Sequence, residues 1–120
     1  MKIAVTSQGT DLTSKVDPRF GRAQYFIIVD TSNDDFKTIE NTQNLNAVQG
    51  AGVQAAQNIV REKVDIVVSG NLGPKAYMTL NAAGIKIALW SDGTVAEAVQ
   101  FVKDNRLQII QSPNVEGHWM

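Results

Sequence analysis

Residues 64–74 read VDIVVSGNLGP, and this stretch sets the architecture of the chain. Its first six residues are apolar at nearly every position, which is the pattern of a β-strand covered on both faces. Residues 70–73 then turn the chain, and Pro74 stands where the first turn of a helix tolerates proline. A buried strand that leads directly into a helix predicts an α/β protein with parallel strands.

The sequence on either side continues this alternation of strands and helices. Strands are expected over residues 2–6, 24–30, 36–40, 64–69 and 85–89, and helices over residues 53–63, 74–83 and 95–105. Right-handed crossovers place the strands that begin at Lys2, Val64 and Ile85 parallel in the centre, with the hairpin of 24–30 and 36–40 antiparallel at one edge. This order predicts an α/β fold, a ribonuclease-H-like three-layer sandwich with a five-stranded mixed sheet.

Length and composition predict one domain over residues 1–110 and a C-terminal tail over residues 111–120. The chain has no cysteine, which excludes thiolate zinc sites, cysteine-held iron–sulfur clusters and thiol nucleophiles. Its net charge of −1 gives no general attraction to nucleic acid or to an anionic membrane. Apolar runs such as residues 25–29 are far shorter than the roughly 20 residues needed to span a bilayer. With no secretory signal pattern, the expected location is cytoplasmic.

Three loops rich in glycine or hydroxyl groups follow the predicted central strands, at residues 7–22, 69–74 and 90–94. Loops at the carboxyl ends of parallel strands form the usual ligand crevice, and helix amino termini there favour anions. Gly50 and Gly52, at the start of another helix, add backbone donors that a ligand can approach closely. The sequence therefore predicts a site for an anionic ligand.

Arg19 and Arg22 supply positive charge in the first of these loops, and arginine suits bidentate recognition of an anion. The alternative is that these arginines lie in solvent and pair with Asp11 or Asp17. Phe20 between them is expected to be a core residue that holds the loop down. No metal ligand is assigned, because the single histidine, His118, lies in the predicted tail.

Catalytic groups are not arranged as a known reaction would need. A Ser-His-Asp relay would require the tail histidine, and no cysteine can replace the serine. A nuclease of the ribonuclease H type needs a carboxylate in the first strand, yet residues 2–6 read KIAVT. Asp65 opens its strand and would lie away from the crevice. We therefore expect a protein that is not an enzyme.

The strings FGRAQYF (20–26), GAG (50–52), SGNLGPKA (69–76) and GIKI (84–87), after an opening KIAV strand, resemble the dinitrogenase iron-molybdenum cofactor biosynthesis family. Its small members are similar to NifX and to the NifB carboxyl-terminal domain. The resemblance implies a carrier for an iron–sulfur or iron–molybdenum cluster precursor. Carried over position by position, it implies a cofactor-binding surface made of Arg19, Arg22, Gly50, Gly52, Ser69, Gly70, Asn71 and Gly73.

Two functions follow from these observations. The first is a non-catalytic binding or carrier protein for an anionic metal cofactor or cluster, held by arginines and backbone amides. The alternative is a regulatory or scaffold module that binds a partner protein without metal, through the edge at residues 25–30 and the loop at residues 41–49. The identity of the ligand and the oligomeric state are left open by the sequence.

Overall fold

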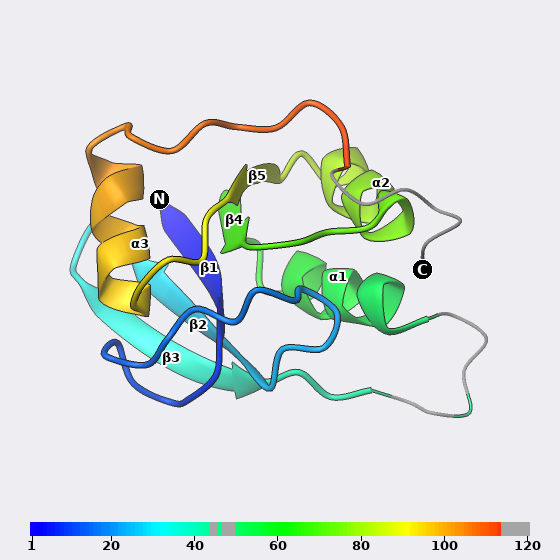
Figure 1. The fold of residues 1–120 in the computed structure, drawn as a ribbon, viewed down its shortest axis with the longest axis horizontal. Coiled ribbons are helices and arrows are strands. Elements are labelled where there is room, and N and C mark those ends of the chain that lie inside the picture. Colours follow the sequence, from blue (N-terminus) through cyan, green and yellow to red (C-terminus); the bar gives the residue numbers. More distant parts are fainter. Residues whose placement is uncertain (44–45, 47–49, 114–120) are drawn as a thin grey trace.

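The computed structural model describes residues 1–43, 46 and 50–113, which form five strands and three helices (Figure 1). The strands are β1 (Lys2–Ser7), β2 (Tyr25–Asp30), β3 (Asp35–Glu40), β4 (Ile66–Ser69) and β5 (Lys86–Leu89); the helices are α1 (Ala51–Arg61), α2 (Pro74–Ala82) and α3 (Val95–Lys103). Every element expected from the sequence is present, with ends shifted by a residue or two. Thus α1 ends before Lys63, which adopts a positive φ of 56°.

The strands form one mixed sheet in the order β3-β2-β1-β4-β5. β1, β4 and β5 are parallel neighbours, whereas β2 pairs antiparallel with both β1 and β3. This confirms the predicted five-stranded mixed sheet with three parallel strands and an antiparallel hairpin. The carboxyl ends of β1, β4 and β5 consequently lie along the same border of the sheet.

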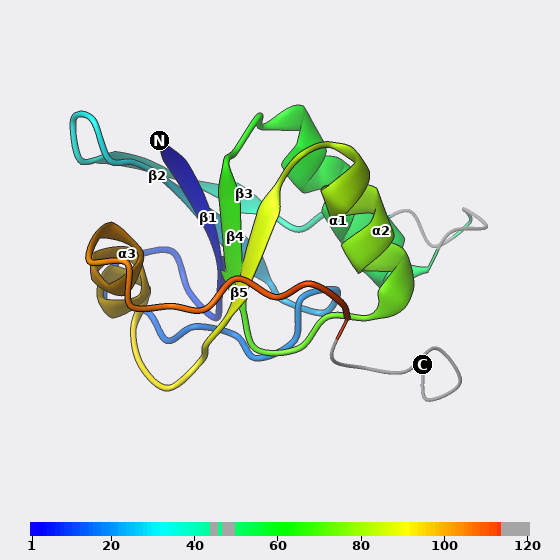
Figure 2. The same ribbon diagram turned by 90° about the horizontal axis from the view of Figure 1, so that it is seen from above.

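Helices cover both faces of the sheet, with α1 and α2 on one side and α3 on the other (Figure 2). Alternate residues of each central strand enter different cores, because successive side chains of a strand point to opposite faces. Ala4 and Val67 pack in the core below α1 and α2, while Ile3, Val5 and Val68 pack in the core below α3. The double coverage explains why residues 64–69 are almost uniformly apolar.

The edge of the sheet on the hairpin side is β3, not β2. Residues Tyr25–Asp30 pair with β1 on one side and with β3 on the other, so their backbone groups are used by the sheet. The interpretation that residues 25–30 present a free edge to a partner protein is therefore wrong. Residues 44, 45 and 47–49 of the loop in that same interpretation lie outside the described residues.

After α3 the chain runs back along the outside of β5 (Figure 1). Ile109 bridges Ala88, and the Ile110 N–H donates to the Ile87 carbonyl at 2.9 Å, so these residues add a small edge element beside β5. Residues 114–120, which include His118, lie outside the described part of the chain. None of the described helices is long and apolar enough to cross a membrane.

Candidate functional site

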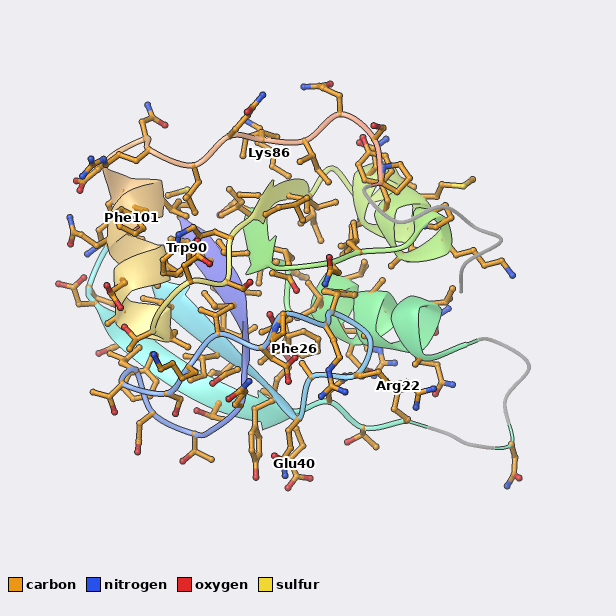
Figure 3. The ribbon with its side chains drawn as sticks, in the orientation of Figure 1. Arg22, Phe26, Glu40, Lys86, Trp90 and Phe101 are labelled. Atoms are coloured by element: carbon orange, nitrogen blue, oxygen red, sulfur yellow. The ribbon has the colours of Figure 1, made fainter. Side chains whose placement is uncertain are left out.

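A hollow of about 560 Å³ lies where the α1 and α2 amino termini meet the loop that follows β1. Three segments line it, residues 19–22, 50–53 and 71–76. Its volume is within the range of roughly 300–1,000 Å³ that is typical of small-molecule sites. Arg22 is seen beside α1, between that helix and the sheet border that carries Glu40 (Figure 3). We call this feature the hollow.

The loop over the hollow is anchored by Phe20. This side chain is only 2% exposed, and its ring lies 5.5 Å from the ring of Phe26 in the core below α1 and α2. The Phe20 N–H also donates to the Asn71 carbonyl at 3.2 Å, which joins the loop to the β4–α2 connection. The prediction that Phe20 is a core residue is confirmed, and its burial fixes the positions of the arginines on either side.

Two glycines allow the loop that follows β1 to touch the neighbouring segments. A Cβ atom on Gly21 would lie 2.8 Å from the Gly52 nitrogen, so the loop packs directly on the first turn of α1. A Cβ atom on Gly70 would lie 2.6 Å from the Pro18 carbonyl oxygen. At both contacts backbone meets backbone, and no larger residue fits without moving one of the segments.

Both helices that face the hollow begin without a side-chain cap. The N-cap residues are Gly50 for α1 and Gly73 for α2, and neither helix has an acidic residue in its first turn. The first N–H groups of a helix have no intrahelical acceptor and carry a partial positive charge. The two amino termini therefore direct hydrogen-bond donors and positive potential at the same volume.

The amino terminus of α3, in contrast, is closed. Thr94 and Glu97 form a capping box, and the Val95 and Ala96 N–H groups donate to the carbonyls of Ser14 and Leu12, each at 2.9 Å. Hydrogen bonds from the Thr94 N–H and hydroxyl hold the pKa of Glu97 below its ordinary value. Because α3 covers the other face of the sheet, residues 90–94 do not join the hollow, contrary to the expectation that all three loops converge.

Positive side chains surround the hollow. Of the described residues that line it, Arg19, Arg22 and Lys75 are cationic and none is acidic. Arg19 contacts the carboxylate of Asp17 through its Nε atom at 3.5 Å, yet its side chain is 64% exposed. Within the described part of the chain, Arg22 and Lys75 form no ion pair. The electrostatic potential of the hollow therefore favours an anion.

The structure brings six of the eight expected site residues to the hollow, namely Arg19, Arg22, Gly50, Gly52, Asn71 and Gly73. Ser69 and Gly70 do not line it. The Ser69 side chain is fully buried and accepts a hydrogen bond from the Thr6 hydroxyl at 3.1 Å, while Gly70 is covered by Pro18. These two residues hold the loops together and do not contact the hollow.

Lys75 was not among the expected site residues. It is the second residue of α2, and its position directly after the turn and Pro74 was a signal in the sequence for a cation at a helix amino terminus. Arg19 and Arg22 reach the same hollow because of the way the loop that follows β1 packs. No local sequence pattern reveals that packing.

The residues of the hollow do not form a metal-ion site of the ordinary kind. The sequence has no cysteine, and no group of three or more His, Cys, Asp or Glu side chains that could hold a metal occurs among the described residues. Guanidinium, ammonium and backbone N–H groups bind the outer atoms of an anion, including the sulfides or oxygens on the surface of a metal cluster. These donors therefore suit an anionic cluster that is bound through its surface atoms, with no side chain of the protein coordinated to its metals.

Comparison with known proteins places the chain in a family. It is 37% identical to the apo form of the orange protein from Desulfovibrio gigas, with a TM-score of 0.89 and coverage of 95% of this chain and 96% of that chain. A Thermotoga protein with an NMR structure is 35% identical, with a TM-score of 0.80 and coverage of 97% of this chain and 98% of that chain. An uncharacterized protein of Methanocaldococcus jannaschii is 30% identical over 111 residues, 90% of each chain. The model of the dinitrogenase iron-molybdenum cofactor family matches residues 1–105, and the chain belongs to that family.

Proposed function

We propose that this protein is a non-catalytic carrier that binds an anionic metal cofactor, or an iron–sulfur cluster precursor of one, in the hollow. One observation carries the proposal: two uncapped helix amino termini and the side chains of Arg19, Arg22 and Lys75 line one volume, with no carboxylate among its described lining residues. Membership of the dinitrogenase iron-molybdenum cofactor family supports a cargo of this kind.

The rest of the lining suits a large anion of low charge density. Beside its cations the hollow is lined by the apolar side chains of Val53, Leu72 and Ala76, and the nearly buried Leu72 and Ala76, each 2% exposed, form its floor. A small, strongly hydrated anion would lose hydrogen bonds to water on such a floor, and the apolar side chains could not replace them. A cluster surface is more weakly hydrated, so it loses less. The apolar floor and the cations of the hollow therefore both favour the proposed cargo.

A carrier role, as opposed to catalysis, is supported by the groups around the hollow. Its described lining residues include no carboxylate, histidine, hydroxyl or thiol side chain. General acid–base and nucleophilic catalysis depend mostly on these groups, positioned within hydrogen-bond reach of the reacting atom. The arrangement can hold and release an anion, and it offers its cargo little that would transform it.

The test is an anaerobic titration with a synthetic [4Fe–4S] cluster that carries four thiolate ligands and a net negative charge. We expect the cluster to bind the wild-type protein saturably. After gel filtration, the protein fraction should show the visible absorbance of the bound cluster. In the variant Arg19→Ala plus Arg22→Ala, each lost contact is worth about 1 kcal/mol at an exposed site, so the affinity falls roughly tenfold or more.

The matched control is Arg61→Ala plus Lys86→Ala, which changes the net charge by the same amount. Arg61 is in the last turn of α1, and Lys86 opens β5, at the sheet border opposite the hollow (Figure 3). The control should bind the cluster as the wild type does. Equal losses of affinity in both double variants would mean that net charge, and not the hollow, governs binding. Absence of saturable binding to the wild type would refute the proposal.

A further inference from the structure

Arg19 is the one cation of the hollow whose side chain is held by another side chain in the described structure. The carboxylate oxygen Oδ1 of Asp17 accepts a hydrogen bond from the Arg19 backbone N–H at 2.9 Å and lies 3.5 Å from its Nε atom. The two side chains differ sharply in environment, since Asp17 is 4% exposed and Arg19 is 64% exposed. A buried carboxylate therefore contacts the inner part of an exposed guanidinium.

Asp17 is itself fixed to the end of β1. Its N–H donates to the Thr6 carbonyl at 2.9 Å, and its own carbonyl accepts a hydrogen bond from the Thr6 hydroxyl at 2.7 Å. The next residue, Pro18, packs against Gly70 at backbone distance. The carboxylate is thus attached to the rigid centre of the sheet and can orient a side chain that would otherwise move freely in solvent.

We propose that Asp17 is a positioning residue, which holds the Arg19 guanidinium by its Nε side so that both Nη amino groups are available to an anion in the hollow. This inference rests on the proposed function. An arginine presented in this way binds through its two amino groups, and it loses less side-chain freedom on binding than an unrestrained one. Asp17 acts through Arg19 and does not touch the cargo.

Positioning of Arg19 by Asp17 predicts a change in binding affinity opposite to the change that charge alone predicts. Replacing Asp17 with asparagine removes a negative charge close to an anion site, which by itself would tighten binding. If orientation is the more important effect, Asp17→Asn instead weakens binding of the synthetic [4Fe–4S] cluster by about threefold to tenfold. The control is Asp11→Asn, an exposed residue of the same loop with the same change in charge, which should leave affinity unchanged or slightly raised.

A double-variant cycle separates positioning from a loss of stability. Arg19→Lys keeps the charge but lacks the Nε group and the guanidinium fork, so it should weaken binding by a similar factor. In the Asp17→Asn background, Arg19→Lys should then have little further effect, because the ion pair that orients Arg19 is already removed. Additive losses in the cycle, or full affinity in Arg19→Lys alone, would overturn the inference even if Asp17→Asn folded poorly.

A second measurement needs no cargo. In the wild type, the ¹⁵N heteronuclear NOE of the Arg19 Nε–H should report a more ordered group than that of Arg22, and Asp17→Asn should remove the difference. Equal disorder of both arginines in the wild type overturns the inference, as does unchanged or tighter cluster binding by Asp17→Asn. If the wild type does not bind the cluster at all, the proposed function fails, and this role of Asp17 fails with it.

Discussion

Substitution of Gly21 by alanine tests the contact that closes the hollow on its α1 side. The added Cβ would lie 2.8 Å from the nitrogen of Gly52, 3.0 Å from its Cα and 3.1 Å from the carbonyl carbon of Ala51. All three are backbone atoms, so no side chain can rotate away. The loop or the first turn of α1 must shift, and the shift also separates two walls of the hollow.

The size of the effect follows from two opposing contributions. Forcing a methyl group into a filled contact costs about 1–3 kcal/mol, while the loss of glycine's freedom in the unfolded chain returns about 0.4–1 kcal/mol. The net destabilisation is about 1–2 kcal/mol. For a chain of this size, the midpoint of thermal unfolding should fall by roughly 4–8 °C.

Gly52→Ala is the matched control, because it changes the other side of the same contact. A Cβ on Gly52 would meet only the Cβ of Ala76 within 4 Å, at 3.4 Å, and Gly52 lies inside α1, where alanine is the better helix former by about 0.5–1 kcal/mol. Its unfolding midpoint should be equal to the wild type or higher. Circular dichroism melts of both variants test the reasoning, which is refuted if Gly21→Ala is as stable as the wild type or if both variants are destabilised equally.

Three further predictions concern the core, the cap of α3 and the charge of the hollow. Phe20→Ala should lower the free energy of unfolding by about 3–5 kcal/mol in urea titrations, because it empties a buried ring site against Phe26; a loss below about 1 kcal/mol would contradict that account. The pKa of Glu97 is lowered in the folded state by its hydrogen bonds from Thr94, so its contribution to stability is present above its ordinary pKa of 4.5 and is lost as the pH falls through the lower folded value. Glu97→Gln should accordingly be less stable than the wild type at neutral pH and equal to it at low pH, and a difference that persists in acid would count against this assignment. Finally, the dissociation constant for the [4Fe–4S] probe should rise when salt is increased from about 0.1 M to about 1 M, since exposed charges are screened over this range; a salt-independent affinity would show that the cations do not contribute.

Local sequence patterns were sufficient for most of the fold. The uniformly apolar run at residues 64–69 became the doubly covered strand β4, the turn formers at residues 31–35 joined the hairpin, and the spacing of Thr94 and Glu97 became a capping box. These features depend on side-chain periodicity and on hydrogen bonds between near neighbours in the chain. Such interactions are written into a few consecutive residues, so they can be predicted without knowing the rest of the molecule.

The composition of the hollow could be predicted in part for a similar reason. Glycine-rich connections after parallel strands must lie at one border of the sheet, which brought Gly50, Gly52, Asn71 and Gly73 into the expected set. The two arginines were recognised by their charge. What no local pattern contained was the inward direction of Ser69 and the closure of the α3 amino terminus by the carbonyls of Leu12 and Ser14.

Those remaining features come from contacts between residues far apart in the chain. The register of β4 against β1 turns the Ser69 hydroxyl toward Thr6, and the burial of Phe20 carries Arg19 and Arg22 to the α1 and α2 termini and away from α3. Asp17 can orient Arg19 only because the Thr6 backbone and hydroxyl hold it at the end of β1. The sequence by itself determined which charged side chains and hydrogen-bond donors this protein has, and where they stand relative to its strands and helices. Only the tertiary structure decided which of them share one surface, because contacts between distant residues set the distances over which charges and hydrogen bonds act.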